Sequence, residues 1–539
     1  MMAHDSETAA VGVPHVGRSR AIRTVVSGVC CRWRVQLLAM GAVILGAKLW
    51  FICVFAGPAP YLDQWDGEAA WLFKPYLEGT LPIGALLAPF GEHRFLWPRL
   101  LSLLLLEFNG RWDPIIEMIF AALVHVAALA GLVGLLGAAL GAVERLILAI
   151  TTAVLFALPF GASNTLAGFQ VWYFLPLFSL ACFHYGVDAP SFSVRWWGAI
   201  ALAVGAYFAM ASGALTLLAL IVVHALLAAV WQQCGWREYA AMALGIVIVV
   251  LMVNGIPTVV PHAPLAAHSL SQFASAFFVA MAWPLSEVAR MPPRAGWDLL
   301  LKNLVAAVLV NLPVLAFVAS RAKHLGTADR SVWIYLLIGL WTALQAASLA
   351  YGRAVSVLDS RYLDLLIINA ILNVACLLRL MQANAGWPSR YAATAWGTAF
   401  ALMVAVLSVF WIPREIREWW WPYTQQRAVN LSAFLATGDK THLTEKPVRA
   451  IPYAASERLI TLATDPTIRS ILPEDIMPSS EARTRNPNLV LGGPLHNLFQ
   501  ALRKSLRYAG LSSLMIGSLV LLCASYVVPA TFSRRTASG

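Results

Sequence analysis

Long runs of apolar residues dominate the chain and determine its predicted architecture. A helix needs about 20 apolar residues to cross the hydrocarbon layer of a bilayer, which is about 30 Å thick. By that criterion the sequence predicts about twelve spans, at residues 36–56, 114–140, 146–161, 170–187, 197–212, 214–232, 239–256, 297–318, 332–350, 363–380, 392–411 and 509–529. Two further apolar segments, 95–108 and 272–290, are short or interrupted, and we interpret them as interfacial or re-entrant helices. The pattern is typical of an all-α polytopic membrane protein.

Composition excludes the other broad classes of protein. Of the 539 residues, 60% are hydrophobic and only 12% are charged, and the mean hydropathy is +0.71. Soluble domains are nearer half apolar and a quarter charged, and disordered chains are more polar still. The 7 cysteines show no metal-ligand spacing and fall mostly in apolar runs, where cysteine behaves as a small hydrophobic residue. A soluble, a disordered and a disulfide-rich secreted protein are therefore excluded.

The basic residues predict the orientation of the spans. The net charge is +11, and because most basic residues lie between apolar runs, we interpret them as cytoplasmic loops and expect no nucleic-acid partner. A polar tail, 1–35, then precedes the first span on the cytoplasmic side. The loops left outside are 57–113, 161–170, 257–296, 351–362 and 412–508, provided that 272–290 does not cross the membrane.

The last of these outside segments differs from the rest of the chain. Residues 412–508 are richer in charge and are punctuated by proline. They predict a small extracytoplasmic domain of short helices, which follows the membrane core of residues 36–411. Residues 509–539 then form a final span and a cytoplasmic tail.

The densest group of ionisable residues follows the first span, in 61–79 and 91–100. Its charged members are interleaved with tryptophan and tyrosine: Asp63, Asp66, Glu68, Lys74, Glu78, Glu92, His93, Arg94 and Arg99. A carboxylate in such an apolar frame is partly desolvated, which raises its pKa and its basicity. The alternative is a hydrated loop beside an interfacial aromatic belt.

Two other outside segments carry candidate chemistry. In 351–366, the guanidinium groups of Arg353 and Arg361, beside Tyr362, suit phosphate oxygens; the alternative is a pair of snorkelling arginines neutralised by neighbouring aspartates. In 161–174, polar and aromatic side chains could bind sugar hydroxyls, although a capped helix start is the favoured interpretation: Asn164, Gln170, Trp172 and Tyr173. Isolated polar residues within spans, such as His125 and His224, more often pack helix against helix.

At these residues the chain resembles the GT-C superfamily of polytopic glycosyltransferases, which includes protein mannosyltransferases and the lipid A aminoarabinose transferase. The resemblance covers the layout of 36–411, and it rests on an outer-loop Asp63 (Tyr-Leu-Asp-Gln-Trp-Asp) followed by the acid–histidine pair Glu92 and His93. Mannosyltransferases have Asp-Glu and His-Pro-Pro-Leu at the comparable places, whereas here Gln64 follows Asp63, and Arg94-Phe95 replaces the Pro-Pro. The superfamily also has a long first outer loop and a charged domain after the core.

The resemblance implies a function and a set of site residues. A sugar would pass, with inversion, from a polyprenyl-phosphate donor to an extracytoplasmic acceptor, which would be a glycan, a lipid or a protein. The membrane is expected to be a bacterial inner membrane, with the site facing the periplasm. Asp63 would be the general base, with Asp66, Glu92 and His93 as further catalytic candidates. The donor phosphate would meet basic and phenolic groups: Arg353, Arg361, Tyr362, Lys74 and Arg94. No cofactor is expected; a divalent metal is compatible with the carboxylates but is not required.

Other functional classes stay open from the residues alone. A transporter or flippase of lipid-linked glycans would place charges along a path through the spans, and few are visible. A membrane acyltransferase would need a catalytic histidine in the membrane, such as His125 or His224. A scaffold that presents 412–508 would leave the charged outer loop unexplained.

Overall fold

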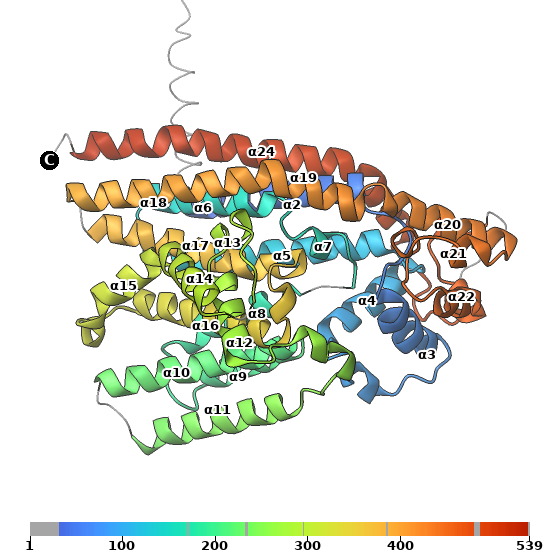
Figure 1. The fold of residues 1–539 in the computed structure, drawn as a ribbon, viewed down its shortest axis with the longest axis horizontal. Coiled ribbons are helices and arrows are strands. Elements are labelled where there is room, and N and C mark those ends of the chain that lie inside the picture. Colours follow the sequence, from blue (N-terminus) through green and yellow to red (C-terminus); the bar gives the residue numbers. More distant parts are fainter. Residues whose placement is uncertain are drawn as a thin grey trace, which may run out of the picture.

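The chain folds as a bundle of helices capped at one end by shorter helices (Figure 1). The computed structural model describes residues 32–169, 172–231, 235–294, 296–383, 386–478 and 486–536, and this part of the chain contains no β-strand. Eight of its helices are long and apolar enough to cross a membrane. The prediction of an all-helical polytopic membrane protein is therefore confirmed.

The long helices match predicted spans closely. They are α2 (Trp33–Phe55), α5 (Pro114–Gly137), α10 (Ala214–Trp231), α11 (Trp236–Asn254), α16 (Arg330–Gly352), α17 (Ser360–Ala383), α18 (Trp387–Val406) and α24 (His496–Thr536). The last of these begins well before the predicted residue 509. Gly46 of α2 lies so close to α24 that an added Cβ would be 2.4 Å from the Leu514 nitrogen, so this glycine allows the first and last spans to pack together.

The remaining predicted spans form shorter or bent helices. Segments 146–161, 170–187 and 197–212 correspond to α6 (Ala142–Ala157), α8 (Phe174–Gly186) and α9 (Val194–Tyr207). Segment 297–318 is split into α14 (Trp297–Val310) and α15 (Leu312–Ala322), which meet at 68°, because Pro313 in the first turn of α15 cannot continue the hydrogen bonding of α14. Counting that pair as one span gives nine by length; the total of twelve stays a prediction.

The two apolar segments that we interpreted as interfacial are also helical. They contain α4 (Leu96–Asn109) and α12 (Leu270–Met281), of 14 and 12 residues, and both are shorter than a span requires.

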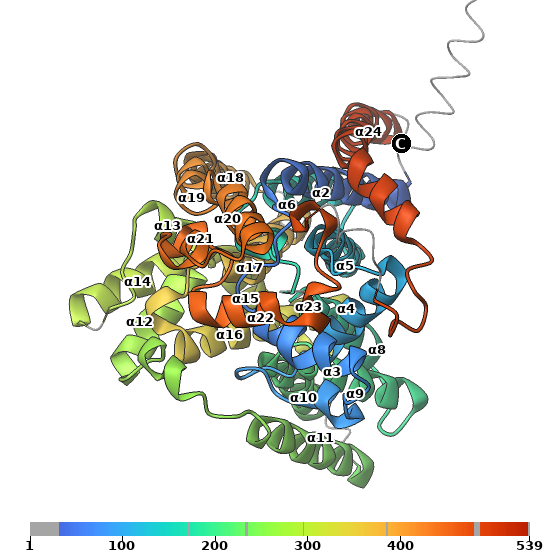
Figure 2. The same ribbon diagram turned by 90° about the vertical axis from the view of Figure 1, so that its right-hand side faces the viewer.

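The cap is one structural unit built from two distant parts of the chain (Figure 2). Its first part contains η1 (Trp65–Phe73), α3 (Lys74–Leu77) and α4, and its second part contains α20 (Tyr423–Thr437), α22 (Ser456–Thr464) and α23 (Pro466–Arg469). Both contribute to one hydrophobic cluster, in which Trp65, Phe73 and Trp112 are buried together with Phe434 and Ile468. The predicted boundary that separated 412–508 from the first outer loop is thus corrected, because the two segments share a core.

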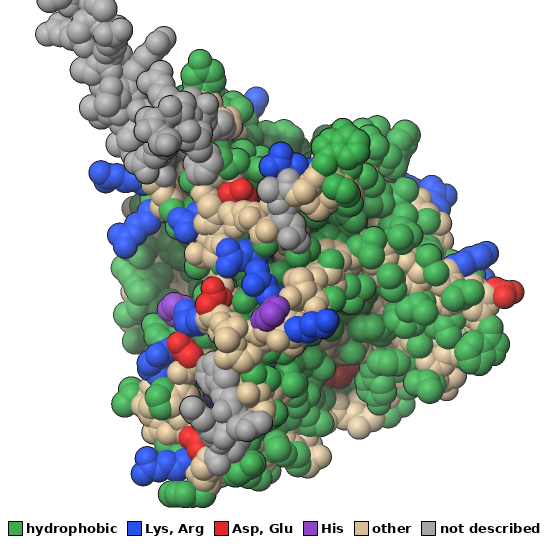
Figure 3. Space-filling model, turned by 90° about the vertical axis from the view of Figure 1, so that its left-hand side faces the viewer, with side chains coloured by type: hydrophobic (Ala, Val, Ile, Leu, Met, Phe, Trp, Pro, Cys, Tyr) green, Lys and Arg blue, Asp and Glu red, His purple; other side chains and the backbone are tan. Residues whose placement is uncertain are grey.

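The end of the bundle opposite the cap is strongly basic. Lys and Arg side chains outnumber Asp and Glu on this face in Figure 3. Several of these cations bind helix ends there: Arg145 donates to the Gly137 carbonyl at 2.8 Å, and Arg379 donates to the Ala139 carbonyl at 2.7 Å. The distribution fits the rule that cytoplasmic loops carry the excess of basic residues.

Candidate functional site

A cluster of charged side chains lies at the mouth of the bundle, below the cap. Glu92 comes from the first outer loop, His262 from η4 (Val260–Leu265) and Arg353 from the C-cap of α16. The Glu92 Oε1 atom lies 2.6 Å from His262 Nδ1, and Arg353 Nη2 donates to both Glu92 oxygens at 3.1 and 3.2 Å. Although burial opposes it, the hydrogen bond to His262 and the charge of Arg353 hold the pKa of Glu92 below its usual value. Glu92 is therefore an anion whose carboxylate oxygens hold the side chains of Arg353 and His262 in place.

Asp63 approaches this cluster from the start of the first outer loop. Its loop is anchored to the cap, because the Leu62 amide donates to the Pro452 carbonyl at 2.8 Å. One side of the Asp63 side chain is open to solvent, but the surrounding protein displaces enough water to raise the pKa of its carboxyl. The Asp63 carboxyl also interacts electrostatically with Arg361 and His262, which partly offset that rise, and with Asp66, which adds to it. Asp63 is thus an accessible carboxylate that is more basic than usual and that interacts with the charges of the Arg361 and His262 side chains.

A series of neighbouring aromatic rings runs across the mouth from Arg361 to His93. Arg361, at the start of α17, pairs with Asp359 at 3.2 Å and lies 5.8 Å from the ring of Tyr362. The Tyr362 ring is 5.7 Å from that of Trp172, whose ring is in turn 5.8 Å from that of His93. The candidate site thus has charged groups on one side and an apolar wall on the other.

His93 belongs to that wall rather than to the charged cluster. Its Nδ1 accepts a hydrogen bond from the Ala211 amide at 3.3 Å. Burial lowers the pKa of His93 to about 4, so the ring is neutral at neutral pH. Its predicted role in proton transfer is therefore poorly matched by its surroundings, because a base with this pKa holds a proton weakly at pH 7.

Three predicted site residues have partners elsewhere in the protein, apart from the cluster around Glu92. Asp66 accepts hydrogen bonds from Arg458, at 2.9 Å, and from Tyr453, and so fastens η1 to the second part of the cap. Lys74 pairs with Asp465 of the cap. Arg94 donates to the carbonyls of Leu87 and Gly255, at 2.7 and 2.9 Å, and holds two loops together. These contacts pair the charged atoms of Lys74 and Arg94 within the protein, and their roles in phosphate binding stay predictions.

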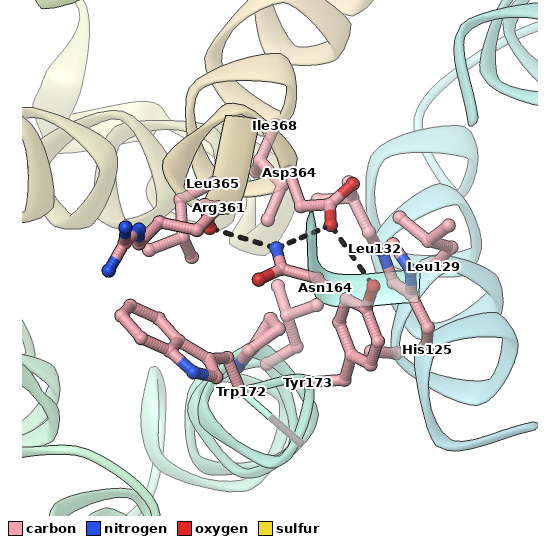
Figure 4. A pocket seen from close by; sticks show the side chains of 13 residues that line it. His125, Leu129, Leu132, Asn164, Trp172, Tyr173, Arg361, Asp364, Leu365 and Ile368 are labelled. Atoms are coloured by element: carbon pink, nitrogen blue, oxygen red, sulfur yellow. Dashed lines mark hydrogen bonds between the residues drawn. The ribbon is translucent and has the colours of Figure 1, made fainter. Parts of the chain in front are cut away.

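Below the mouth, the Asp364 carboxylate of α17 is surrounded by polar groups from distant parts of the chain, two of which are drawn in Figure 4. Asn164 Nδ2 and Tyr173 Oη donate to Asp364 Oδ2 at 2.8 and 3.1 Å, and Lys48 of α2 lies close enough to interact with its charge. Gly161 permits this approach, since an added Cβ would be 2.2 Å from the same oxygen. Asn164 also donates to the Arg361 carbonyl at 2.8 Å, so the network positions the backbone that carries Arg361.

A narrow cavity beside this network leads from Arg361 and Trp172 into the apolar core. Its walls include His125, which stacks on Tyr173 with ring centres 3.8 Å apart. The free space inside has room for about one water molecule. Asn164 and Trp172 both line this cavity, and among the described residues the Asn164 Oδ1 atom and the Trp172 indole nitrogen have no hydrogen-bond partner; a buried water would satisfy them. Gln170, which we predicted beside them, lies outside the described residues.

A second buried acidic group lies under η1. Gln64 Nε2 donates to Glu68 and to Glu117, at 2.8 Å each. Trp112 and Ser102 also donate to Glu68, and Glu68 and Glu117 are 0% and 2% exposed. Burial raises the pKa of Glu68 to about 7, so this carboxyl carries a proton in acid and gives it up only near neutral pH.

Sequence reasoning missed three of these residues. Lys48 is the clearest omission, because a charged residue within a span is by default a candidate functional residue. Glu117, in the first turn of α5, carried the same signal. His262 lies in a loop that was predicted outside, but nothing in its local sequence, Val-Pro-His-Ala-Pro, linked it to Glu92, which is 170 positions away.

No protein-family model, no curated protein and no solved structure matches the chain. Within the described residues, no three His, Cys, Asp or Glu side chains are grouped so that they could hold a metal ion. The chemistry of the site must therefore be argued from its own residues.

Proposed function

We propose that the chain is a membrane glycosyltransferase that moves a sugar from a polyprenyl-phosphate donor to an acceptor at the cap end of the bundle. The observation that carries the proposal is Asp63, an exposed carboxylate of raised pKa that lies close enough to Arg361 to interact with its charge. A base and a phosphate-binding cation near each other in one mouth are what an inverting sugar transfer requires, since the acceptor hydroxyl must lose a proton while the phosphate leaves.

In this proposal Asp63 removes the proton from the acceptor hydroxyl as its oxygen attacks the anomeric carbon. The bond between that carbon and the donor phosphate oxygen breaks, and the leaving phosphate carries the bonding electron pair. Arg361, whose side chain is 43% exposed, can reach this phosphate. A guanidinium in a partly desolvated mouth stabilises such developing negative charge.

Glu92 and Arg353 have a supporting role in this mechanism. Glu92 is already bound by Arg353 and His262, so its lone pairs are directed at those groups rather than at an acceptor. It acts as a positioning residue that keeps Arg353 and His262 on the phosphate side. Tyr362, Trp172 and His93 supply a wall on which the apolar face of a sugar can pack.

The acceptor is a glycan, lipid or protein that reaches the cap end of the bundle. The basic opposite end supports an orientation with the cap outside the cytoplasm. For a bacterial inner membrane this end would face the periplasm. The GT-C resemblance noted above provides the same orientation and the same class of donor, and both belong to the proposal.

The decisive experiment compares Asp63→Asn with the parent protein in proteoliposomes. Radiolabelled polyprenyl-phosphate sugars are supplied, and transfer or release of sugar is measured. We expect Asp63→Asn to reduce the rate about 10²–10⁴-fold, the contribution of a general base. Glu78→Gln is a matched control, because Glu78 is an exposed carboxylate of the same loop and should leave the rate unchanged. A parental rate in folded Asp63→Asn would exclude the proposed base.

A transporter of lipid-linked glycans is a second candidate. It is favoured by the buried side chains of Lys48 and Asp364, which interact electrostatically, since charges within spans often mark a transport path. The two functions differ in their products. Vesicles that move labelled lipid-linked glycan across the bilayer without breaking the sugar–phosphate bond would support the transporter and reject the transferase.

A further inference from the structure

A wide cleft opens at the basic end of the bundle, on the far side from the candidate site. It lies between α5, α8 and α16 and encloses about 630 Å³, within the range of ligand-binding pockets in proteins. Its deep walls are apolar, while its mouth carries His184, Tyr185, Asp329 and Arg330. The cleft is therefore polar at its mouth and apolar further in.

Small residues on one face of α5 make the cleft. Ala128, Gly131, Gly134 and Ala138 follow one another at intervals of three or four residues and all line it, so they share one side of the helix. A Cβ added to Gly131 or Gly134 would meet no atom within 4 Å. In contrast to Gly46, these two glycines do not serve close helix packing; they border open space.

The depth of the cleft matches one leaflet of a bilayer. Ala128 and Ala138 mark its two ends on α5, and ten residues of helix rise about 15 Å. The hydrocarbon layer is about 30 Å thick, so the cleft reaches from the membrane surface to about the midplane. Its inner limit, at Ala128 and Leu180, is shared with the narrow cavity below Arg361.

The mouth of the cleft carries Arg330 and Asp329, and further charged side chains pair with them from outside its lining. Arg330 and Arg195 share one carboxylate, Asp188, and Arg379 lies 3.8 Å from Asp329. Within this connected group three guanidinium groups face two carboxylates, which leaves one positive charge to be neutralised. A phosphate group of a lipid is of suitable charge and lies at this depth in a membrane.

We propose that this cleft binds an anionic phospholipid of the leaflet at the basic end of the bundle, with one acyl chain between α5 and α8 and the phosphate beside Arg330. The chain fills the space that Gly131 and Gly134 leave open, and it ends against the wall that separates the cleft from the candidate site. This lipid site does not depend on the proposed transferase activity.

The test measures bound lipid on the full-length protein after extraction in a mild detergent. Native mass spectrometry counts retained phospholipids for the parent and for Gly131→Leu, whose side chain occupies the cleft. Gly397→Leu is the matched control, because a Cβ at Gly397 of α18 also meets nothing within 4 Å but faces no part of the cleft. We expect one retained phospholipid in the parent and in Gly397→Leu, and its loss in Gly131→Leu.

A second variant tests the head group. Arg330→Gln, re-equilibrated in nanodiscs that contain equal amounts of phosphatidylglycerol and phosphatidylcholine, should lose the preference of the parent for the anionic lipid while it still retains a lipid. Equal lipid retention by the parent and by monodisperse Gly131→Leu would overturn the proposal. Retention of a polyprenyl phosphate in place of the phospholipid would also overturn it, as would a parent with no tightly held lipid.

Discussion

Glu92 and Glu68 lie in the same outer loop, yet the protein gives their carboxyl groups opposite states. Glu92 is held as an anion by Arg353 and His262 at the mouth. Glu68 is buried on the inner side of η1, where Gln64 donates both to it and to Glu117, and burial raises its pKa to about 7. A cation within hydrogen-bonding distance decides the first case, and its absence around Glu68 among the described contacts decides the second. The difference separates a region that organises chemistry from one that seals the cap onto the bundle.

The largest effect that would break this comparison is expected from Arg353→Met, which removes the cation at Glu92. We expect sugar transfer to fall about 10²–10³-fold, the usual cost of removing a preorganised group that supports transition-state charge. The pH profile of transfer should shift as well, because Glu92 then loses the partner that lowers its pKa. Arg353→Lys should restore part of the rate; a variant with parental transfer would show that Arg353 has no part in the site.

The next effect concerns the stability of the buried pair. The folded protein keeps the Glu68 proton up to a pH of about 7, whereas an unfolded glutamate loses it near pH 4.3. The parent therefore loses stability as the pH rises between these two values. Glu68→Gln is uncharged at every pH, so it should exceed the parent by up to about 4 kcal/mol above pH 7 and match it below about pH 4.

Thermal unfolding in detergent across that pH range measures the difference between parent and Glu68→Gln. Glu78→Gln serves as the control, with a curve parallel to that of the parent. A Glu68→Gln variant that is less stable than the parent at alkaline pH would indicate a charged Glu68 in the folded protein.

The contribution of Glu92, at the mouth, to folding stability should change with pH in the opposite direction. Because the pKa of Glu92 is lowered in the folded protein, its ion pair stabilises the fold at neutral pH and ceases to do so as acid protonates it, below about pH 4.3. Glu92→Gln should therefore be less stable than the parent at pH 7, with the gap closing on acidification. The same unfolding assay measures it, and a gap that widens in acid would refute the assignment.

The smallest effect is expected at the rim of the cap. Arg458→Ala removes the ion pair with Asp66, but the Arg458 side chain is 44% exposed, so solvent screens the pair and the loss should be below about 1 kcal/mol. Transfer should stay near the parental rate. A loss of transfer comparable to that in Arg353→Met would place Asp66 in the chemistry after all.

How much of the fold could be predicted depends on how far apart in the sequence the interacting residues lie. Apolar runs, which depend on neighbouring residues only, predicted helices such as α5, α16 and α17 to within a few residues. They also predicted polar residues at the mouth, because charged groups avoid the bilayer. The pairing of Glu92 with His262 and of Lys74 with Asp465 joins positions 170 and 391 apart. No local pattern encodes such contacts, so the sequence did not predict the partners that Lys74, Asp66 and Arg94 have within the protein.

The shared core of the cap has a consequence for biosynthesis. Trp65 and Phe73 leave the ribosome early, but their partners Phe434 and Ile468 are synthesised more than 350 residues later, when most of the membrane helices already exist. The first loop must wait with its aromatic side chains uncovered, a state that favours aggregation and attracts chaperones. Nascent chains that stop before residue 430 would keep this loop uncovered permanently, which gives cellular proteases a simple way to recognise and remove incomplete copies.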